Sequence, residues 1–238
     1  MGIARSMPRL IVFVGTVGSG KSTQMQLLGK WLRRKGVKTR VTVLKTNHLS
    51  SNLLTSVLVN VLLSAKERTF PIGMLIEHRP ALLKKLLRLW FILDCFSVSL
   101  KFLWDVVLPL RMGRVVLVEE YLPAIVADYF YISKALDASP RIAISTIKRV
   151  STILSSAGPM FVVFLDAQSN VLRKRWKMRS SPTEKAAYIK IQRGLLLECS
   201  KRISSADLLF VDTTTRTVVE TQEYIRAYLD MRAEEQPD

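Results

Sequence analysis

The chain has 238 residues, a formal net charge of +17 and a pI near 10.2, and 49% of its residues are hydrophobic. These totals allow an α/β domain with a large core and exclude a disordered chain. The basic surface attracts polyanions, so a nucleic-acid or membrane partner is one interpretation, and a solvated basic surface without a partner is the other. Cys95 and Cys199 are far apart in apolar stretches, without disulfide or metal-ligand spacing, which favours a reducing, cytoplasmic location.

Strands and helices alternate along the chain. Apolar, β-branched runs bounded by glycine or polar turns predict strands at 10–14, 39–45, 114–120, 159–167 and 207–213. Amphipathic or apolar segments predict helices at 22–35, 50–65, 81–111 (one or two helices), 124–137, 140–156, 184–201 and 218–232. This order indicates βαβ units, and we predict a three-layer α/β fold whose mostly parallel five-stranded sheet is flanked by helices. Residues 1–238 form a single domain, with tails at 1–8 and 233–238.

The segment 86–110 is long and apolar enough to require comparison with a membrane span. Charged residues interrupt it, so no charge-free window reaches the ~18 residues that a span needs. Ser97, Lys101 and Asp105 recur every four residues and share one helical face. We therefore expect a helix that is buried on most sides, with one polar edge, rather than a spanning helix.

The stretch "IVFVGTVGSGKSTQ" carries the strongest motif in the sequence. It matches G-x-x-x-x-G-K-[ST], directly after a predicted strand and before a predicted helix. Glycines let backbone N–H groups converge on an anion, and the helix N-terminus adds its dipole. We predict a P-loop NTPase fold in which ATP is bound by Gly15, Thr16, Val17, Gly18, Ser19, Gly20, Lys21, Ser22 and Thr23. Lys21 is the predicted catalytic cation on the β- and γ-phosphates.

A P-loop also needs a carboxylate for its metal ion, and the strand "VVLVEE" ends in two. Glu119 and the hydroxyl of Ser22 are the predicted Mg²⁺ ligands, because ligands bind at the carboxyl ends of α/β strands. Glu120 is a predicted catalytic residue, since a second acid at this place can polarise a water molecule. The alternative is a pair of solvated loop acids.

An arginine-rich lid is predicted at 172–183, within "LRKRWKMRSSPT". Arg175 and Arg179 are one helical turn apart and share a face, so both are predicted to neutralise the transferring phosphoryl group. The alternative is a basic helix whose charged face is only solvated.

With these residues in place, the chain resembles the thymidylate kinase family of P-loop nucleoside monophosphate kinases, from Leu10 to about Leu229. "FVGTVGSGKSTQMQLLGKWLRRKG" is similar to that family's first strand, P-loop and first helix. "VFLDAQSNVLRKRWKMR" is similar to its fourth strand and lid, and "LLFVDTTTRTVVETQEYI" to its last strand and the loop that lies against adenine. The resemblance implies ATP as donor, a nucleoside monophosphate such as dTMP as acceptor, and a homodimer packed through apolar helices.

The departures from the family gather at the acceptor site. Val17 replaces an acid of the P-loop, and Lys45 begins "KTNH" where the family has Arg-Glu-Pro-Gly. Asp94 lies in "LDC" instead of Ala-Asp-Arg, and Glu120 and Tyr121 follow Glu119 where the family has Asp-Arg-Tyr. Lys45, Asp94 and Tyr121 are the predicted acceptor-binding residues of this altered site.

The sequence leaves three functions open. The first is a kinase that transfers the γ-phosphate of Mg·ATP to a nucleoside monophosphate. The second is an ATPase or nucleotide-dependent switch, in which Glu120 activates water and the basic surface binds nucleic acid or a membrane. The third is a regulator that binds nucleotide without catalysis.

Overall fold

Parallel strands form one sheet in the order β2-β3-β1-β4-β5 in the computed structural model, which describes residues 8–63, 71–178, 186–203 and 207–235. The strands are β1 (Leu10–Gly15), β2 (Thr39–Leu44), β3 (Val115–Glu120), β4 (Phe161–Asp166) and β5 (Leu208–Asp212). All neighbours pair in parallel, so their carboxyl ends meet at one edge of the sheet. The predicted α/β fold with a five-stranded sheet is confirmed.

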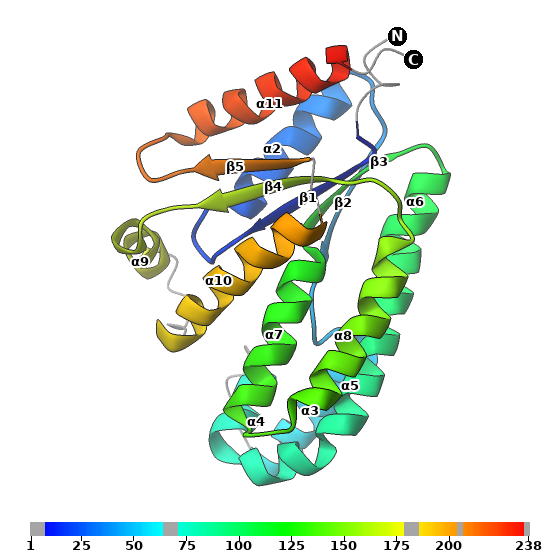
Figure 1. The fold of residues 1–238 in the computed structure, drawn as a ribbon, viewed down its shortest axis with the longest axis vertical. Coiled ribbons are helices and arrows are strands. Elements are labelled where there is room, and N and C mark those ends of the chain that lie inside the picture. The colour runs from blue at the N-terminus through cyan, green and yellow to red at the C-terminus, as the bar shows by residue number, and fades with distance from the viewer. Residues whose placement is uncertain (1–7, 64–70, 179–185, 204–206, 236–238) are drawn as a thin grey trace.

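Helices cover both faces of the sheet, with α2 and α11 on one face and α7 and α10 on the other (Figure 1). A further layer of helices packs against α7 at the lower end of the view in Figure 1. The helices are α2 (Lys21–Arg34), α3 (Leu49–Leu63), α4 (Pro71–His78), α5 (Pro80–Phe102), the π-helical η1 (Leu103–Val107), α6 (Leu108–Arg111), α7 (Tyr121–Ala135), α8 (Pro140–Ser155), α9 (Ser169–Lys177), α10 (Ala186–Ile203) and α11 (Val218–Glu235).

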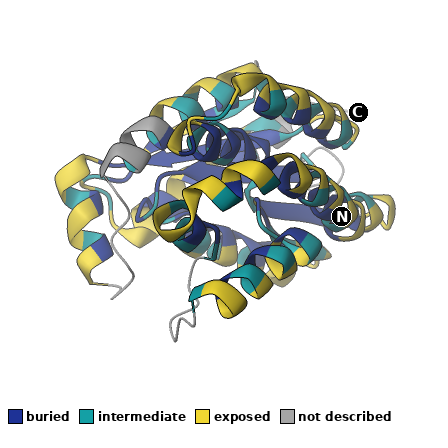
Figure 2. Ribbon diagram, turned by 90° about the horizontal axis from the view of Figure 1, so that it is seen from below, coloured by how far each residue is buried: buried dark blue, intermediate teal, exposed yellow. Residues whose placement is uncertain are grey.

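The alternating side chains of β1 divide the core into two clusters. Ile11 and Phe13 pack with Leu28 of α2, whereas Val12 and Val14 belong to the cluster on the α7 face. Every residue of β1 is buried, as expected for the central strand of a sheet that is covered on both sides. Figure 2 shows buried residues along the sheet and exposed residues on the outer faces of the helices.

Two helical regions differ from the sequence prediction. The helix α4 was not predicted, because its eight residues are too few for a clear period. The predicted helix 81–111 is one continuous rod made of α5, η1 and α6. Pro109, which lacks an N–H, lies at the junction of η1 and α6, where the hydrogen-bond pattern widens.

The polar edge predicted for segment 86–110 lies in the interior of the protein. Ser97 is fully buried with its Oγ 2.7 Å from Ser50 Oγ, and the buried carboxylate of Asp105 is paired with Arg40. These internal partners satisfy the buried polar groups of the rod. The exposed side of the rod is apolar. Within the described residues, no helix meets the length and hydrophobicity that crossing a bilayer requires.

Candidate active site

The loop between β1 and α2 is shaped by three glycines with positive φ. These are Gly15 at 149°, Gly18 at 85° and Gly20 at 99°. A Cβ atom on Gly15 would lie 2.0 Å from the carbonyl oxygen of Leu165 in β4, so no larger residue fits there. The sequence forms this loop because only glycine combines the required backbone conformation with such a close approach to the neighbouring strand.

The inside of the loop carries hydrogen-bonding groups suited to an anion. The hydroxyls of Thr16 and Ser19 are buried, and neither has a hydrogen-bond partner among the described residues. Buried polar atoms normally have partners, so these two are free to donate to a bound phosphate. The N-terminus of α2, which begins at Lys21, adds N–H groups that point the same way. The loop therefore fits the phosphates of a nucleotide.

Lys21 lies folded over the loop and is only 6% exposed. Its ammonium donates to the carbonyl oxygens of Gly15 at 2.8 Å and Thr16 at 3.2 Å. The third contact is an ion pair with Glu120, whose Oε1 is 3.3 Å away. An ammonium has three protons, and these contacts engage all three. A bound phosphate would compete for them.

Glu119 reaches the same helix from the end of β3. Its Oε1 accepts a hydrogen bond of 2.7 Å from the Ser22 hydroxyl. In the sheet Glu119 lies between Phe13 of β1 and Val43 of β2, and β1 leads directly into the loop. Hydroxyl and carboxylate oxygens are hard ligands of the kind that bind Mg²⁺ beside phosphate oxygens. The predicted metal ligands are thus brought together with a chemistry that fits Mg²⁺.

The backbone turns sharply after Glu119. Glu120 has φ 80° and ψ −78°, and Tyr121, the first residue of α7, has φ 63°. Neither is glycine, and such conformations cost about 1–3 kcal/mol each. Successive residues of a strand point to opposite faces, yet the carboxylates of Glu119 and Glu120 contact the adjacent residues Ser22 and Lys21. The strained turn thus lies where the two carboxylates meet the start of α2.

Arg175 of the predicted lid contacts both the loop between β1 and α2 and the residue that follows β5. Its guanidinium donates to Thr213 Oγ1 at 2.9 Å and to the Thr213 carbonyl oxygen at 2.7 Å, and it lies 3.4 Å from the Gly18 carbonyl oxygen. Thr213 Oγ1 is also 3.2 Å from the carbonyl oxygen of Ser19. Arg175 therefore ties α9, the P-loop and the loop after β5 together. The other predicted lid arginine, Arg179, lies outside the described residues.

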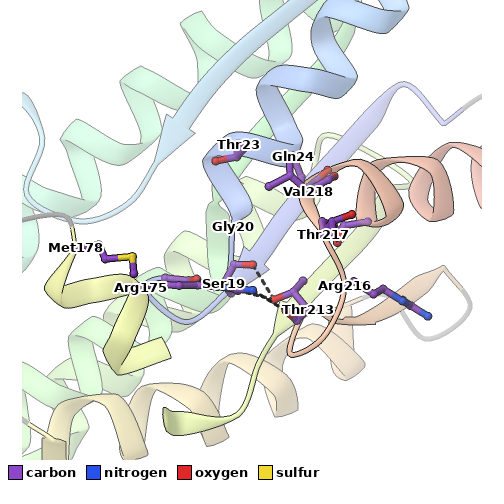
Figure 3. Close-up of a pocket in the computed structure, with 12 residues that line it drawn as sticks. Ser19, Gly20, Thr23, Gln24, Arg175, Met178, Thr213, Arg216, Thr217 and Val218 are labelled. Atoms are coloured by element: carbon purple, nitrogen blue, oxygen red, sulfur yellow. Dashed lines mark hydrogen bonds between the residues drawn. The ribbon is translucent and has the colours of Figure 1, made fainter. Parts of the chain in front are cut away.

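A cavity of about 300 Å³ opens beside these contacts (Figure 3). In Figure 3, Arg175 extends from α9 toward Ser19 and Thr213, while Thr217 and Val218 border the opposite side. Its lining comprises Gly18, Ser19, Gly20, Thr23, Gln24, Arg175, Met178, Thr213, Arg216, Thr217, Val218 and Thr221. Gln24, Met178 and the residues from Thr213 onward were not named singly as predicted site residues. Those from Thr213 onward lie in the stretch "LLFVDTTTRTVVETQEYI", which was expected to include a loop that lies against adenine.

Asp94 and Tyr121, two of the predicted acceptor-binding residues, have internal partners. Asp94 is fully buried and accepts hydrogen bonds from the Asn47 N–H and Ser51 Oγ at 2.7 Å and from the Tyr129 hydroxyl at 2.8 Å. Burial raises its pKa despite these bonds. Tyr121 is also fully buried, and its hydroxyl donates to the Leu154 carbonyl oxygen at 2.8 Å. Their contact with an acceptor stays a prediction.

Lys45, the third of these residues, is exposed at the carboxyl end of β2. Its backbone N–H donates to His48 Nε2 at 3.3 Å. Burial, together with the charges of Lys101 and Lys45, lowers the pKa of His48 to about 4. His48 is therefore neutral at pH 7, and the positive charge at this strand end comes from Lys45 and Lys101.

The site and the sheet define a P-loop α/β fold. No protein-family model matches the sequence, and no curated protein matches it. Among solved structures, the chain is similar to a thymidylate kinase from Ehrlichia chaffeensis, with a TM-score of 0.55 and 16% identity over 95% of this chain and 99% of that one. It is also similar to the thymidylate kinase from Candida albicans, with a TM-score of 0.53 and 16% identity over 97% and 94%. The fold is thus that of thymidylate kinases.

Proposed function

We propose that the protein is an ATP-dependent phosphotransferase of the nucleoside monophosphate kinase type. The observation that supports it is the convergence of Lys21, Ser22 and Glu119 at one helix N-terminus, beside a loop with unpaired buried hydroxyls. In this proposal the loop binds the triphosphate, and Lys21 stabilises the charge on the transferring group. Ser22 and Glu119 would hold Mg²⁺, which would supply positive charge against the phosphates. Arg175 closes the cavity over the donor nucleotide.

The acceptor is the finer part of this proposal. The two similar structures are thymidylate kinases, so dTMP is the first monophosphate to test. A cytoplasmic location is proposed with it, since Cys95 and Cys199 are both free thiols in the structure.

The test is ADP release from Mg·ATP over a panel of nucleoside monophosphates, with a blank that lacks an acceptor. Lys21→Ala should abolish release, whereas Lys30→Ala, an exposed lysine on the same helix, should not change it. Release that requires an acceptor supports the phosphotransferase. ADP release in the blank that no acceptor increases would indicate an ATPase instead of a phosphotransferase. ATP binding without any ADP release would indicate a non-catalytic regulator instead of a phosphotransferase.

We also propose that a second copy of the chain covers the outer side of the α5 rod. All residues of the rod that are exposed between Leu89 and Leu108 are large and apolar: Leu89, Ile92, Phe96, Leu100, Leu103, Trp104 and Leu108. This row is about 28 Å long at 1.5 Å per residue, and soluble monomers rarely expose so continuous an apolar surface. An antiparallel two-fold pairing would bury the row and keep the basic N-terminal ends of the two rods apart.

Light scattering coupled to gel filtration tests this pairing. The wild type should elute as a dimer, and Phe96→Glu should elute as a monomer with unchanged circular dichroism. Lys148→Glu, on the exposed face of α8, is the matched control. A monomeric wild type that binds anionic vesicles or nucleic acid would assign the surface to one of those partners instead.

A further inference from the structure

Three neighbouring strands are each preceded by a basic residue. Arg9 precedes β1, Lys38 precedes β2 and Arg114 precedes β3, and the sheet order β2-β3-β1 places these strands side by side. The backbone holds the strand starts level, because the Val115 N–H donates to the Lys38 carbonyl oxygen at 2.9 Å and the Val116 N–H donates to that of Arg9 at 2.7 Å. Adjacent strands lie about 4.8 Å apart. The three basic residues are therefore neighbours at the amino edge of the sheet.

Basic residues at the ends of two helices extend this row. Arg33 and Arg34 lie in the last turn of α2, and Arg111 ends α6, which Figure 1 shows beside the amino ends of the strands. Arg33 donates from Nη1 to Thr39 Oγ1 at the start of β2, at 2.9 Å. The dipole of a helix favours cations at its C-terminus, but it does not explain the basic residues that precede the strands. We call the whole set the amino-edge patch: Arg9, Arg33, Arg34, Lys38, Arg111 and Arg114.

The amino-edge patch has no counter-charge among the described residues. None of its six side chains forms an ion pair with a described acidic residue, and the segments 8–9, 33–38 and 108–114 contain no Asp or Glu. Elsewhere basic side chains have such partners, as Arg232 has in Asp207. Like charges that lie close together repel one another, which destabilises a fold unless an anionic partner offsets the repulsion. The patch is therefore suited to binding an anion.

An exposed apolar side chain lies within the amino-edge patch. Met112 is 57% exposed, in the turn between Arg111 and Arg114 where Gly113 has φ 72°. It lies beyond the apolar row of the rod, which ends at Leu108. An apolar side chain surrounded by basic residues matches the surface of a bilayer, which has anionic headgroups over an apolar interior.

The described part of the patch offers no exposed aromatic ring to nucleic-acid bases. Single-stranded nucleic acid is usually bound by aromatic side chains on which its bases stack. The aromatic side chain of α2 near the patch is Trp31, which is only partly exposed. Cations already lie over its ring, with Lys35 Nζ at 3.9 Å and the Arg226 guanidinium at 5.3 Å from the centroid. These features favour a lipid surface over nucleic acid.

We infer that the amino-edge patch binds the surface of a membrane that contains anionic lipids, with Met112 inserted among the headgroups. The nucleotide-binding loop begins at Gly15, at the other end of β1. Six strand residues at about 3.3 Å each separate the two places by about 20 Å. The bound protein would thus keep its nucleotide site away from the membrane. This inference goes beyond the proposed phosphotransferase function and does not depend on it.

Vesicle flotation measures the binding. One set of vesicles contains phosphatidylcholine with about a third phosphatidylserine, and the matched set contains phosphatidylcholine alone. Single-stranded and duplex DNA are the competing probes. The patch variant is Lys38→Gln/Arg114→Gln, and the control is Lys134→Gln/Arg141→Gln. Lys134 and Arg141 are exposed in α7 and α8, so the two double variants have the same net charge and differ only in where charge is lost.

A second pair of variants separates Met112 from the apolar row of the rod. Met112→Ser removes the apolar side chain in the patch, and Phe96→Ser removes one that is 62% exposed on α5. Circular dichroism and calorimetric ATP binding are measured for every variant. Neither property should change in the patch variant, because its residues lie at the edge of the sheet opposite the P-loop.

We expect the wild type to bind the anionic vesicles and not those of phosphatidylcholine alone. The patch variant should bind about 25-fold more weakly, because each basic residue near an anionic surface contributes about 5-fold. Met112→Ser should bind about 3- to 10-fold more weakly, since it loses apolar surface from the interface. The control double variant and Phe96→Ser should bind as the wild type does.

Other outcomes would overturn the inference. A wild type that ignores anionic vesicles would do so, whatever its phosphotransferase activity. Equal losses in the patch variant and its control would attribute vesicle binding to net charge alone. Loss in Phe96→Ser with full binding by Met112→Ser would move the membrane contact to the rod. Tighter binding to DNA than to vesicles, lost in the patch variant, would assign the amino-edge patch to nucleic acid.

Discussion

The Ser22 hydroxyl donates a 2.7 Å hydrogen bond to Glu119 Oε1 across 97 positions of sequence. This bond joins the first turn of α2 to the end of β3, and both partners are oxygen ligands of the kind that Mg²⁺ prefers. In the proposed function this pair would hold the metal ion, and the neighbouring pair of Lys21 and Glu120 forms an ion pair beside it.

Removing either oxygen ligand should weaken the Mg²⁺-dependent binding of ATP more than it affects the stability of the fold. We expect Ser22→Ala and Glu119→Gln to raise the Mg²⁺ concentration for half-maximal ATP binding about 10-fold or more, because ligand loss weakens a divalent site by such factors. Calorimetric titration of ATP at several Mg²⁺ concentrations measures this. Ser145→Ala, an exposed serine on α8, is the control. Equal Mg²⁺ dependence in all variants would remove the metal role of this pair.

Gly15 should tolerate no side chain. Gly15→Ala places a Cβ atom 2.0 Å from the Leu165 carbonyl oxygen, so β1 and β4 must separate locally. We expect a loss of about 1–3 kcal/mol in the free energy of unfolding together with loss of ATP binding. Gly194→Ala is the matched control, since nothing lies within 4 Å of its Cβ and it lies inside α10. That variant should gain about 0.5–1 kcal/mol, and urea unfolding measures both.

Arg175 should affect nucleotide affinity more than stability. Arg175→Ala removes the hydrogen bonds to Thr213 that close one side of the cavity, and we expect the Kd for ATP to rise about 10-fold. Arg175→Lys should recover little, because an ammonium cannot donate to both Thr213 oxygens in the fork geometry of a guanidinium. Arg173→Ala, exposed on the same helix, is the control for charge. An unchanged Kd in Arg175→Ala would separate this side chain from nucleotide binding.

The sheet and the P-loop were predictable because their signals are local. The motif from Gly15 to Ser22 is contiguous, and the strand before it is an uninterrupted apolar run. Glu119 was also within reach, since a carboxylate that ends a buried strand lies at the ligand-binding edge of an α/β sheet. No rule for short segments could pair Arg175 with Thr213, because that contact depends on β4 and β5 being neighbours.

The predicted acceptor-binding residues were harder to place, because Asp94 and Tyr121 are buried although their side chains are polar. Asp94 lies in an apolar segment, where an ionisable residue normally indicates an exposed or ligand-binding position. Its three hydrogen-bond donors come from the loop after β2, from α3 and from α7, which only the tertiary structure brings together. Tyr121 follows the strand end, but α7 begins at that residue and its side chain turns into the core. The sequence alone shows neither the hydrogen-bond partners of Asp94 nor the burial of Tyr121.

Asp94 should make the stability of the fold depend on pH. Burial raises its pKa in the folded state above the ordinary value of 3.8, so the folded protein binds this proton more tightly than the unfolded chain. The stabilising contribution is therefore complete below pH 3.8 and is lost as the pH rises through the folded-state pKa. Asp94→Asn keeps an acceptor for Asn47 and Ser51 and presents a donor to Tyr129, without a charge. It should be at least as stable as the wild type at pH 7.

Urea unfolding of both proteins between pH 7 and pH 4 measures this difference. The advantage of Asp94→Asn should shrink as the pH falls, because the wild-type carboxyl then becomes protonated in the folded state as well. Asp94→Leu is the contrasting variant. It leaves the Tyr129 hydroxyl and the Asn47 N–H buried without an acceptor, at about 1–3 kcal/mol each, and should be less stable at every pH. An Asn variant that is destabilised equally across the range would mean that Asp94 is ionised in the fold and stabilises it through its charge.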